Sequence, residues 1–146
     1  MDSTLTLDVN AARLLHIDWL MQLEKALAPG SGASSIKRPQ SDSECTLGHW
    51  LHTVGRVRYS QFEEIKHLIS AHKTFHRLID RGISQLHQGE REKAQALLHE
   101  ARQVSKDIIY LLTFIELEIV ERERKKYLAL HPFDAIFSLF SGGVKL

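Results

Sequence analysis

The sequence predicts an all-α protein: an antiparallel four-helix bundle with a short extra helix carrying the cysteine and a short C-terminal tail helix. Apolar residues recur at helical period in successive segments, and Pro, Gly or turn residues separate those segments. No stretch shows the apolar–polar alternation typical of a strand. The chain has 146 residues, of which 43% are hydrophobic. This length fits one domain with a sizeable core.

The first helix is predicted over residues 8–28. Asp8 is a suitable N-cap, and Pro29 with Gly30 ends the helix. His16 falls within the predicted inward-facing stripe. That stripe comprises Leu14, Ile17, Leu20 or Met21, Leu23 or Glu24, and Leu27.

Residues 31–44 are polar, contain Ser, Gly and Pro, and predict a flexible loop at the long end for a compact domain. A short helix follows over residues 46–54, and Gly55 is expected to end it as the C′ residue. Ser60 and Glu63 then have the spacing of a capping box, which predicts that the next helix begins there.

That helix is expected to continue to about His87, and Gln88 with Gly89 forms a tight turn after it. Gly82 lies inside the helix, where close helix packing is the favoured explanation. The predicted inner face comprises Phe62, Ile65, Leu68 or Ile69, His72, Phe75 or His76, and Ile79.

A long helix is predicted over residues 90–130. Residues 108–120 are apolar nearly all round, so we expect burial on two faces. One face would meet the core, and the other predicts a homodimer. The alternative is that the C-terminal tail folds back over the second face.

Pro132 is expected to break this helix, and an amphipathic tail follows that includes Phe133, Ile136, Phe137 and Phe140. We expect the tail to dock on its own bundle or on the dimer mate, with a partner protein or a membrane surface as the alternative. The predicted organisation is therefore a bundle over residues 1–130 and a tail over residues 131–146.

Composition excludes several classes of function. The formal net charge is +1, which gives no electrostatic support for nucleic-acid binding. The N-terminus lacks the pattern of a signal peptide, and the most apolar run is too short to span a membrane. A single cysteine excludes an intrachain disulfide and fits a reducing compartment, so we expect a cytoplasmic protein.

One thiol and three imidazoles form a candidate zinc site. His72 and His76 are four residues apart, which separates their side chains by about 40° around a helix. Together with His16 and Cys45 they supply a complete tetrahedral ligand set. For any single histidine the alternative is a buried neutral side chain with one hydrogen bond. The other histidines are expected at exposed or end positions: His49, His52, His67, His87, His99 and His131.

The residues around the cysteine resemble the chemoreceptor zinc-binding (CZB) domain family. Cys45, Leu47, Gly48 and Trp50 match its Cys-x-Leu/Phe-Gly-x-Trp segment. His16, shortly before Trp19, and the later His72-x-x-x-His76 match the family's other histidines in the same order. The resemblance covers roughly residues 8–120.

This resemblance implies zinc bound by His16, Cys45, His72 and His76 in a four-helix bundle that dimerises. Members of the family are usually fused to chemoreceptors or diguanylate cyclases and tune signalling in response to zinc or oxidants. No receptor coiled coil or cyclase domain follows here, so we expect a stand-alone member that passes its signal to such a partner in trans.

Four protein ligands close the zinc coordination sphere, which favours sensing over catalysis. Zinc would hold Cys45 as the oxidisable thiolate. Three alternatives stay open: a haemerythrin-like iron bundle, for which Glu64 and His67 form the only Glu-x-x-His motif; a purely structural helical interaction protein; and an enzyme with Cys45 as nucleophile and a histidine base.

Overall fold

The computed structural model describes residues 7–30, 36–38 and 41–141, and every regular element among them is helical, which confirms the all-α prediction. The chain divides into two compact units, Met1–Thr113 and Phe114–Leu146. Among the described helices, none combines the length and hydropathy needed to cross a bilayer.

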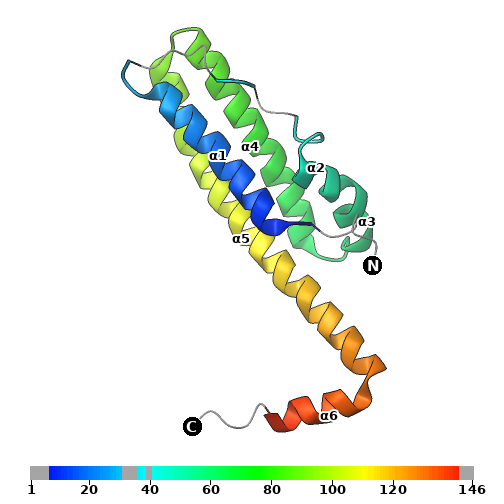
Figure 1. Cartoon of the computed structure of the whole chain (residues 1–146). Coiled ribbons are helices and arrows are strands. Elements are labelled where there is room, and N and C mark those ends of the chain that lie inside the picture. The colour runs from blue at the N-terminus through cyan, green and yellow to red at the C-terminus, as the bar shows by residue number, and fades with distance from the viewer. Residues whose placement is uncertain (1–6, 31–35, 39–40, 142–146) are drawn as a thin grey trace. The chain divides into compact units, whose positions relative to one another are not determined.

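Three long helices build the first unit: α1 (Val9–Leu27), α4 (Glu63–His87) and the first part of α5 (Arg91–Leu130). Figure 1 shows α1 lying along both α4 and α5, with the short helical segment beside the N-terminal part of α4. The predicted bundle is therefore present, and a short segment takes the place of its fourth long helix.

Polar contacts between α1 and α5 fix their antiparallel direction. Arg13, near the start of α1, donates to Thr113 Oγ1 at 2.8 Å. Glu24, further along α1, pairs with Arg102 at 2.7 Å. Arg91 begins α5 and donates to the carbonyl oxygen of Ala28 at 3.2 Å. As the residue number increases along α1, the number of the contacting residue in α5 decreases, so the two helices run antiparallel.

The helix boundaries follow the predicted capping residues at two places. Asp8 caps α1, and its carboxylate accepts from the Ala11 backbone N–H at 2.9 Å. Gly89 has φ +79° in the turn between α4 and α5, a conformation that favours glycine. Gly82 meets the predicted close packing, since a Cβ there would lie 2.9 Å from Leu23 Cδ2.

The inner face predicted for α4 is confirmed, but the one predicted for α1 is wrong at Leu14 and Ile17, and of the alternatives Leu20 and Met21 only Leu20 is half-buried. Leu14, Ile17 and Met21 are exposed by 65%, 36% and 60%. The buried residues of α1 are instead Ala12, His16, Leu23 and Ala26. The helix is rotated so that His16 faces Cys45, His72 and His76, and this rotation turns the more apolar stripe outward.

The cysteine-bearing segment is longer than predicted. It comprises α2 (Thr46–Trp50), the π-helix η3 (Leu51–Gly55) and α3 (Arg56–Arg58), so Gly55 does not end a helix. A Cβ on Gly55 would lie 2.9 Å from the Trp50 indole ring. Glycine is present here because the tryptophan ring packs over its backbone, and not because a helix ends.

The capping box predicted at Ser60 is also wrong. Helix α4 begins at Glu63, and its N-cap is Phe62, which makes no side-chain capping bond. Phe62 stacks instead on Tyr59, with ring centroids 6.5 Å apart, and Tyr59 stacks on Trp50. Aromatic packing thus fixes the entry to α4, and the acidic first turn, Glu63 and Glu64, suits the helix dipole.

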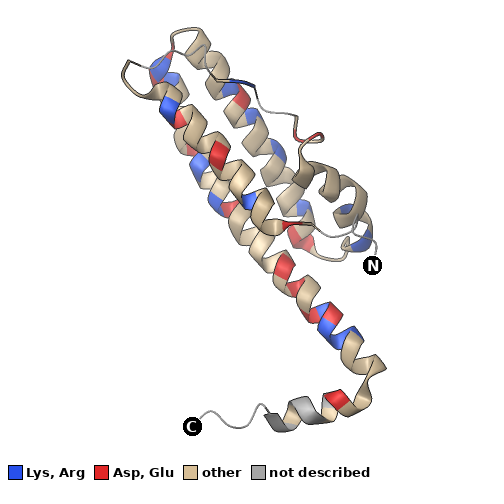
Figure 2. Ribbon diagram, in the orientation of Figure 1, with Lys and Arg blue, Asp and Glu red and all other residues tan. Residues whose placement is uncertain are grey.

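The second unit contains the end of α5 and α6 (Pro132–Ser141). Its large apolar side chains are mostly exposed, including Leu117 by 64%, Phe133 by 78% and Leu139 by 81%. The predicted tail residues Phe137 and Phe140 have side chains outside the described residues. Figure 2 shows acidic and basic residues interspersed along this part of α5.

Candidate metal centre

The four residues singled out from the sequence lie together. One ligand atom from each of His16, Cys45, His72 and His76 falls within 4.8 Å of every other. All four side chains are buried. They come from α1, the start of α2 and one face of α4, so three segments distant in sequence meet at this point.

His72 lies at the centre of the cluster. Its Nε2 is 3.0 Å from Cys45 Sγ and 3.1 Å from His76 Nε2. The His72 and His76 ring centroids are 4.5 Å apart, and the His16 ring is 5.0 Å from that of His72. The four-residue spacing on α4 therefore brings both imidazoles to one point, as predicted.

His16 has the tautomer of a metal ligand. Its Nδ1 lies 2.6 Å from the carbonyl oxygen of Ala12, one helical turn earlier. A carbonyl can only accept, so Nδ1 carries the proton and Nε2 of the neutral ring carries a lone pair. That Nε2 is buried and has no hydrogen-bond partner among the described residues. A buried polar atom without a partner costs about 1–3 kcal/mol, and a metal ion would satisfy this one.

Cys45 occupies the N-cap of α2. Its Sγ accepts from the Gly48 backbone N–H at 3.3 Å, as an N-cap oxygen would in a serine or aspartate. The sulfur also lies 3.8 Å from the carbonyl oxygen of Asp42. The helix start thus aims the sulfur at the cluster and supplies a donor that favours the thiolate.

The remaining residues of the cysteine motif keep this geometry. A Cβ on Gly48 would lie 1.5 Å from the Asp42 carbonyl oxygen and 3.0 Å from His72 Cε1, so no side chain fits there. Leu47 is fully buried, and Trp50 is 5% exposed. The glycine allows the loop to cross close to the helix, while the two apolar residues anchor the helix in the core.

Burial keeps the imidazoles of His16 and His72 neutral and the Cys45 thiol protonated in the absence of a cation. The pKa of His72 is lowered to about 3, mainly by desolvation and in addition by the neighbouring His76 and His16. Desolvation likewise lowers the pKa of His16 to about 4, against the opposing effect of its bond to Ala12. Desolvation raises the pKa of Cys45 despite the Gly48 N–H. Neutral imidazoles are ready to bind a metal, and a dication would favour the thiolate.

The donor set fits zinc. Zinc–nitrogen bonds of about 2.0–2.1 Å and zinc–sulfur bonds of about 2.3 Å place tetrahedral ligand atoms about 3.3–3.6 Å apart. The separations of His72 Nε2 from Cys45 Sγ and from His76 Nε2, 3.0 Å and 3.1 Å, are close to these values, and the whole group spans at most 4.8 Å. One sulfur and three nitrogens leave no position for a bound water, which is the arrangement of a closed site.

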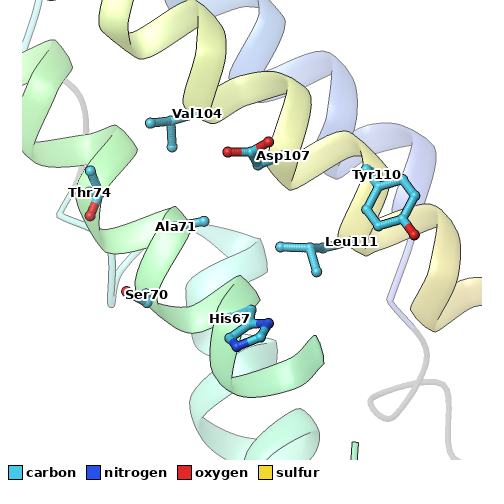
Figure 3. Close-up of a pocket in the computed structure, with 8 residues that line it drawn as sticks. All are labelled: His67, Ser70, Ala71, Thr74, Val104, Asp107, Tyr110 and Leu111. Carbon is cyan, nitrogen blue, oxygen red and sulfur yellow. The ribbon is translucent and has the colours of Figure 1, made fainter. Parts of the chain in front are cut away.

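Carboxylates are absent from this cluster within the described part of the chain, which removes the main support for an iron bundle. His67, the histidine of the Glu-x-x-His motif, lines a separate cavity of about 440 Å³ between α4 and α5. Figure 3 shows its ring on α4, on the opposite side of the cavity from Leu111 and Tyr110 of α5. The other histidines not assigned as ligands are exposed, as predicted: His49, His52, His87, His99 and His131.

Three supporting residues were not found from the sequence. Ala12 fixes the His16 tautomer, and its place four residues earlier on the helix could have indicated it. Asp42 contributes only its backbone, which no sequence pattern marks. Arg38 fastens the predicted flexible loop to α4, with bonds of 3.1 Å to Asp80 and to Ser84. The described part of that loop therefore makes specific contacts.

Comparison with known proteins agrees with this site. Residues 16–83 match the family model described as the chemoreceptor zinc-binding domain. The matched range begins at the first residue of the cluster, His16, and includes the other three. No curated protein and no solved structure matches the chain.

Proposed function

Residues 16–83 of this chain belong to the chemoreceptor zinc-binding domain family, and we propose that the protein is a zinc-binding regulatory module of bacterial signal transduction. In this proposal residues 1–130 form the zinc-binding bundle and residues 131–146 a tail. Zinc is the family's metal, and the chain has a cluster able to hold it. The protein acts by changing a partner's activity and not by catalysis.

The proposed ligands are His16, Cys45, His72 and His76. The observation that carries this assignment is the buried Nε2 of His16, which has no hydrogen-bond partner in the described part of the chain and lies beside three further ligand atoms. A purely structural bundle has no need of four inward-facing polar donors, since each costs free energy to bury. A metal ion converts that cost into stability.

A regulatory role follows from the closed donor set. Catalytic zinc usually keeps a water in its fourth position, and four protein donors leave none. Zinc supplies positive charge here that stabilises the Cys45 thiolate. That thiolate caps α2, so its oxidation or protonation would weaken both the metal site and the start of the helix that carries Trp50. The site is thus suited to respond to zinc level or to oxidant.

To pass on a signal, the protein needs a surface that contacts another protein. Tyr110, Leu117 and Val120 of α5 are exposed by 69%, 64% and 59%. On α1, Leu14 and Met21 are similarly exposed. We propose that a second copy covers exposed apolar side chains of α5, giving a homodimer. A chemoreceptor or diguanylate cyclase in trans, in the cytoplasm, is the proposed recipient of the signal.

Metal analysis tests the proposal. The purified protein is expected to contain one zinc per chain and no iron. Cys45→Ala is expected to remain helical by circular dichroism and to bind zinc at least about tenfold more weakly, since it loses one of four ligands. His49→Ala, which removes an exposed histidine four residues away, is the matched control. Unchanged zinc affinity in Cys45→Ala would sink the assignment.

A second measurement separates sensing from a structural role. The zinc-loaded protein is treated with a mild thiol oxidant, and bound zinc and helix content are followed together. A sensor is expected to release zinc and recover it on reduction. A structural site would keep its zinc under conditions that leave the rest of the protein unmodified.

A further inference from the structure

The four proposed ligands differ in their access to solvent. His16 and His72 are each 1% exposed and Cys45 is 2% exposed, whereas His76 is 7% exposed. His76 also lines a cavity of about 500 Å³, and it is the one residue of the cluster that does so. The cluster therefore meets the surface of the molecule at His76 and not at the cysteine.

The cavity lies between the loop before Cys45 and the middle of α4. Arg38 and Asp42 line it from the loop, and Lys73, Arg77 and Asp80 line it from α4. The ion pair between Arg38 and Asp80, 3.1 Å long, joins the two sides. Arg38 and Asp42 thus line one side of the cavity, and the bridge from Arg38 to Asp80 on the other side is about half exposed to solvent.

Charge in the cavity favours small anions. Its lining contains three cationic side chains, Arg38, Lys73 and Arg77, against the carboxylates of Asp42 and Asp80. A zinc ion with one thiolate and three neutral imidazoles would add a further net positive charge behind His76. A cavity lined by one excess sign of charge concentrates ligands of the other sign and raises their association rates.

We infer that this cavity is the entrance to the metal site and that it admits small anionic metal-binding molecules. The inference rests on the zinc site proposed above and adds where exchange begins. An anionic chelator enters between the loop and α4, is attracted by Lys73 and Arg77, and competes first at His76. Cys45, covered by the Asp42 backbone, is reached last.

The test measures zinc removal from the loaded full-length protein. Two chelators are compared, EDTA, which is anionic, and a neutral pyridylmethyl-amine chelator. Protein-bound zinc is determined over time by elemental analysis. The double variant Lys73→Glu with Arg77→Glu is expected to slow removal by EDTA by about threefold or more at low salt, and to leave the neutral chelator's rate unchanged.

Matched controls make the test specific. Lys93→Glu with Lys106→Glu changes the net charge equally, but these exposed residues of α5 lie outside the cavity lining. EDTA is expected to remove zinc from this control variant at the same rate as from the wild type. The neutral pair, Lys73→Gln with Arg77→Gln, is expected to give an intermediate rate. All variants are first checked for one bound zinc per chain.

Three results would overturn the inference. The first is a wild-type rate that does not rise with EDTA concentration, because zinc would then leave before any chelator entered. The second is that the cavity pair and the control pair of charge reversals slow zinc removal by EDTA equally. That result would show that only the overall charge of the protein matters, and not the charge of the cavity. The third is equal slowing of both chelators by the cavity variant. A wild-type protein that purifies without zinc would instead overturn the proposed function and, with it, the entrance.

Discussion

The first unit of the chain contains nearly all of the buried apolar side chains, whereas those of the second unit are mostly exposed. Leu23, in the first unit, is fully buried, whereas Leu139, in the second, is 81% exposed. Both lie on helices. The first unit also buries four polar donors at one point, while the second has charged residues interspersed with exposed apolar ones. Helix formation is thus common to both units, but a specific core belongs to the first.

The difference indicates two separate tasks. Burying a cluster of neutral imidazoles and a thiol costs free energy, and binding a cation would offset that cost in the first unit. Exposed apolar side chains on a helix are typical of a surface that another protein covers. We expect metal binding to control the stability of the first unit, and association with a partner to control the second.

Zinc removal should have the largest effect on the first unit. The free energy of unfolding is expected to fall by at least about 4 kcal/mol on chelation, which corresponds to zinc at about a thousand times its dissociation constant. Urea denaturation of loaded and chelated protein, followed by circular dichroism, measures this. Superimposable denaturation curves would contradict a metal-organised core.

A matched pair of leucine substitutions tests the contrast in packing. Leu23→Ala should lower the free energy of unfolding by about 3 kcal/mol, because it leaves a cavity beside Gly82. Leu139→Ala should change it by less than about 0.5 kcal/mol, because the side chain is exposed. Urea denaturation of both variants gives the comparison. Equal losses would show that α6 belongs to the same core.

Helical period and the ligand spacing made the fold and the cluster predictable. His72 and His76 on one turn, and Asp8 before an apolar periodic run, depend only on local geometry. The inner face of α1 was not predictable in the same way. Leu14, Ile17 and Met21 form the more apolar stripe, yet the helix turns His16 inward. A long-range requirement, the meeting of three segments at one point, outweighed the local preference.

The predicted ends of the cysteine-bearing segment were wrong for a related reason. Gly55 and Ser60 have the residue types of a helix end and a capping box, but stacking among Trp50, Tyr59 and Phe62 decides the backbone there. Aromatic packing between residues that are not on one helical face leaves no period in the sequence. The Arg38 contact with Asp80 is 42 positions apart in sequence, and charged residues are too common for such a pair to be predicted.

Acidity should also destabilise the metal-free first unit, by an amount that grows as the pH falls. His16 and His72 have pKa values lowered to about 4 and about 3, so the folded protein keeps them neutral where the unfolded chain takes up protons. The unfolded state binds more protons below about pH 6.5, and stability falls from that pH towards pH 4. The slope is at most about 1.4 kcal/mol per pH unit for each group.

Urea denaturation of chelated protein at pH 7, 6 and 5 measures this slope. His16→Leu, which removes one of the titrating groups, should reduce it. His99→Leu, which removes an exposed histidine of α5, is the control and should leave the slope unchanged. A free energy of unfolding that stays constant from pH 7 to pH 5 would show that the imidazoles are not held neutral by burial.

Substitutions at the exposed apolar positions of α5 should have the smallest effect on folding stability and the largest effect on association. Leu117→Glu with Val120→Glu places two carboxylates on the exposed apolar positions of α5. The free energy of unfolding of the monomer should change by less than about 0.5 kcal/mol. The proposed dimer should weaken at least about tenfold, since each carboxylate would have to be desolvated in the interface.

Sedimentation velocity over a range of concentrations measures that change in association. Lys125→Gln with Lys126→Gln lowers the net charge by the same two units at exposed positions one to two turns further along α5, and should leave the dimer intact. A dimer that survives the glutamate pair but dissociates with Leu14→Glu and Met21→Glu would move the interface to the outward stripe of α1. In that case the rotation that points His16 at the metal site would also be what exposes the dimer surface, and zinc binding and association would be coupled through one helix.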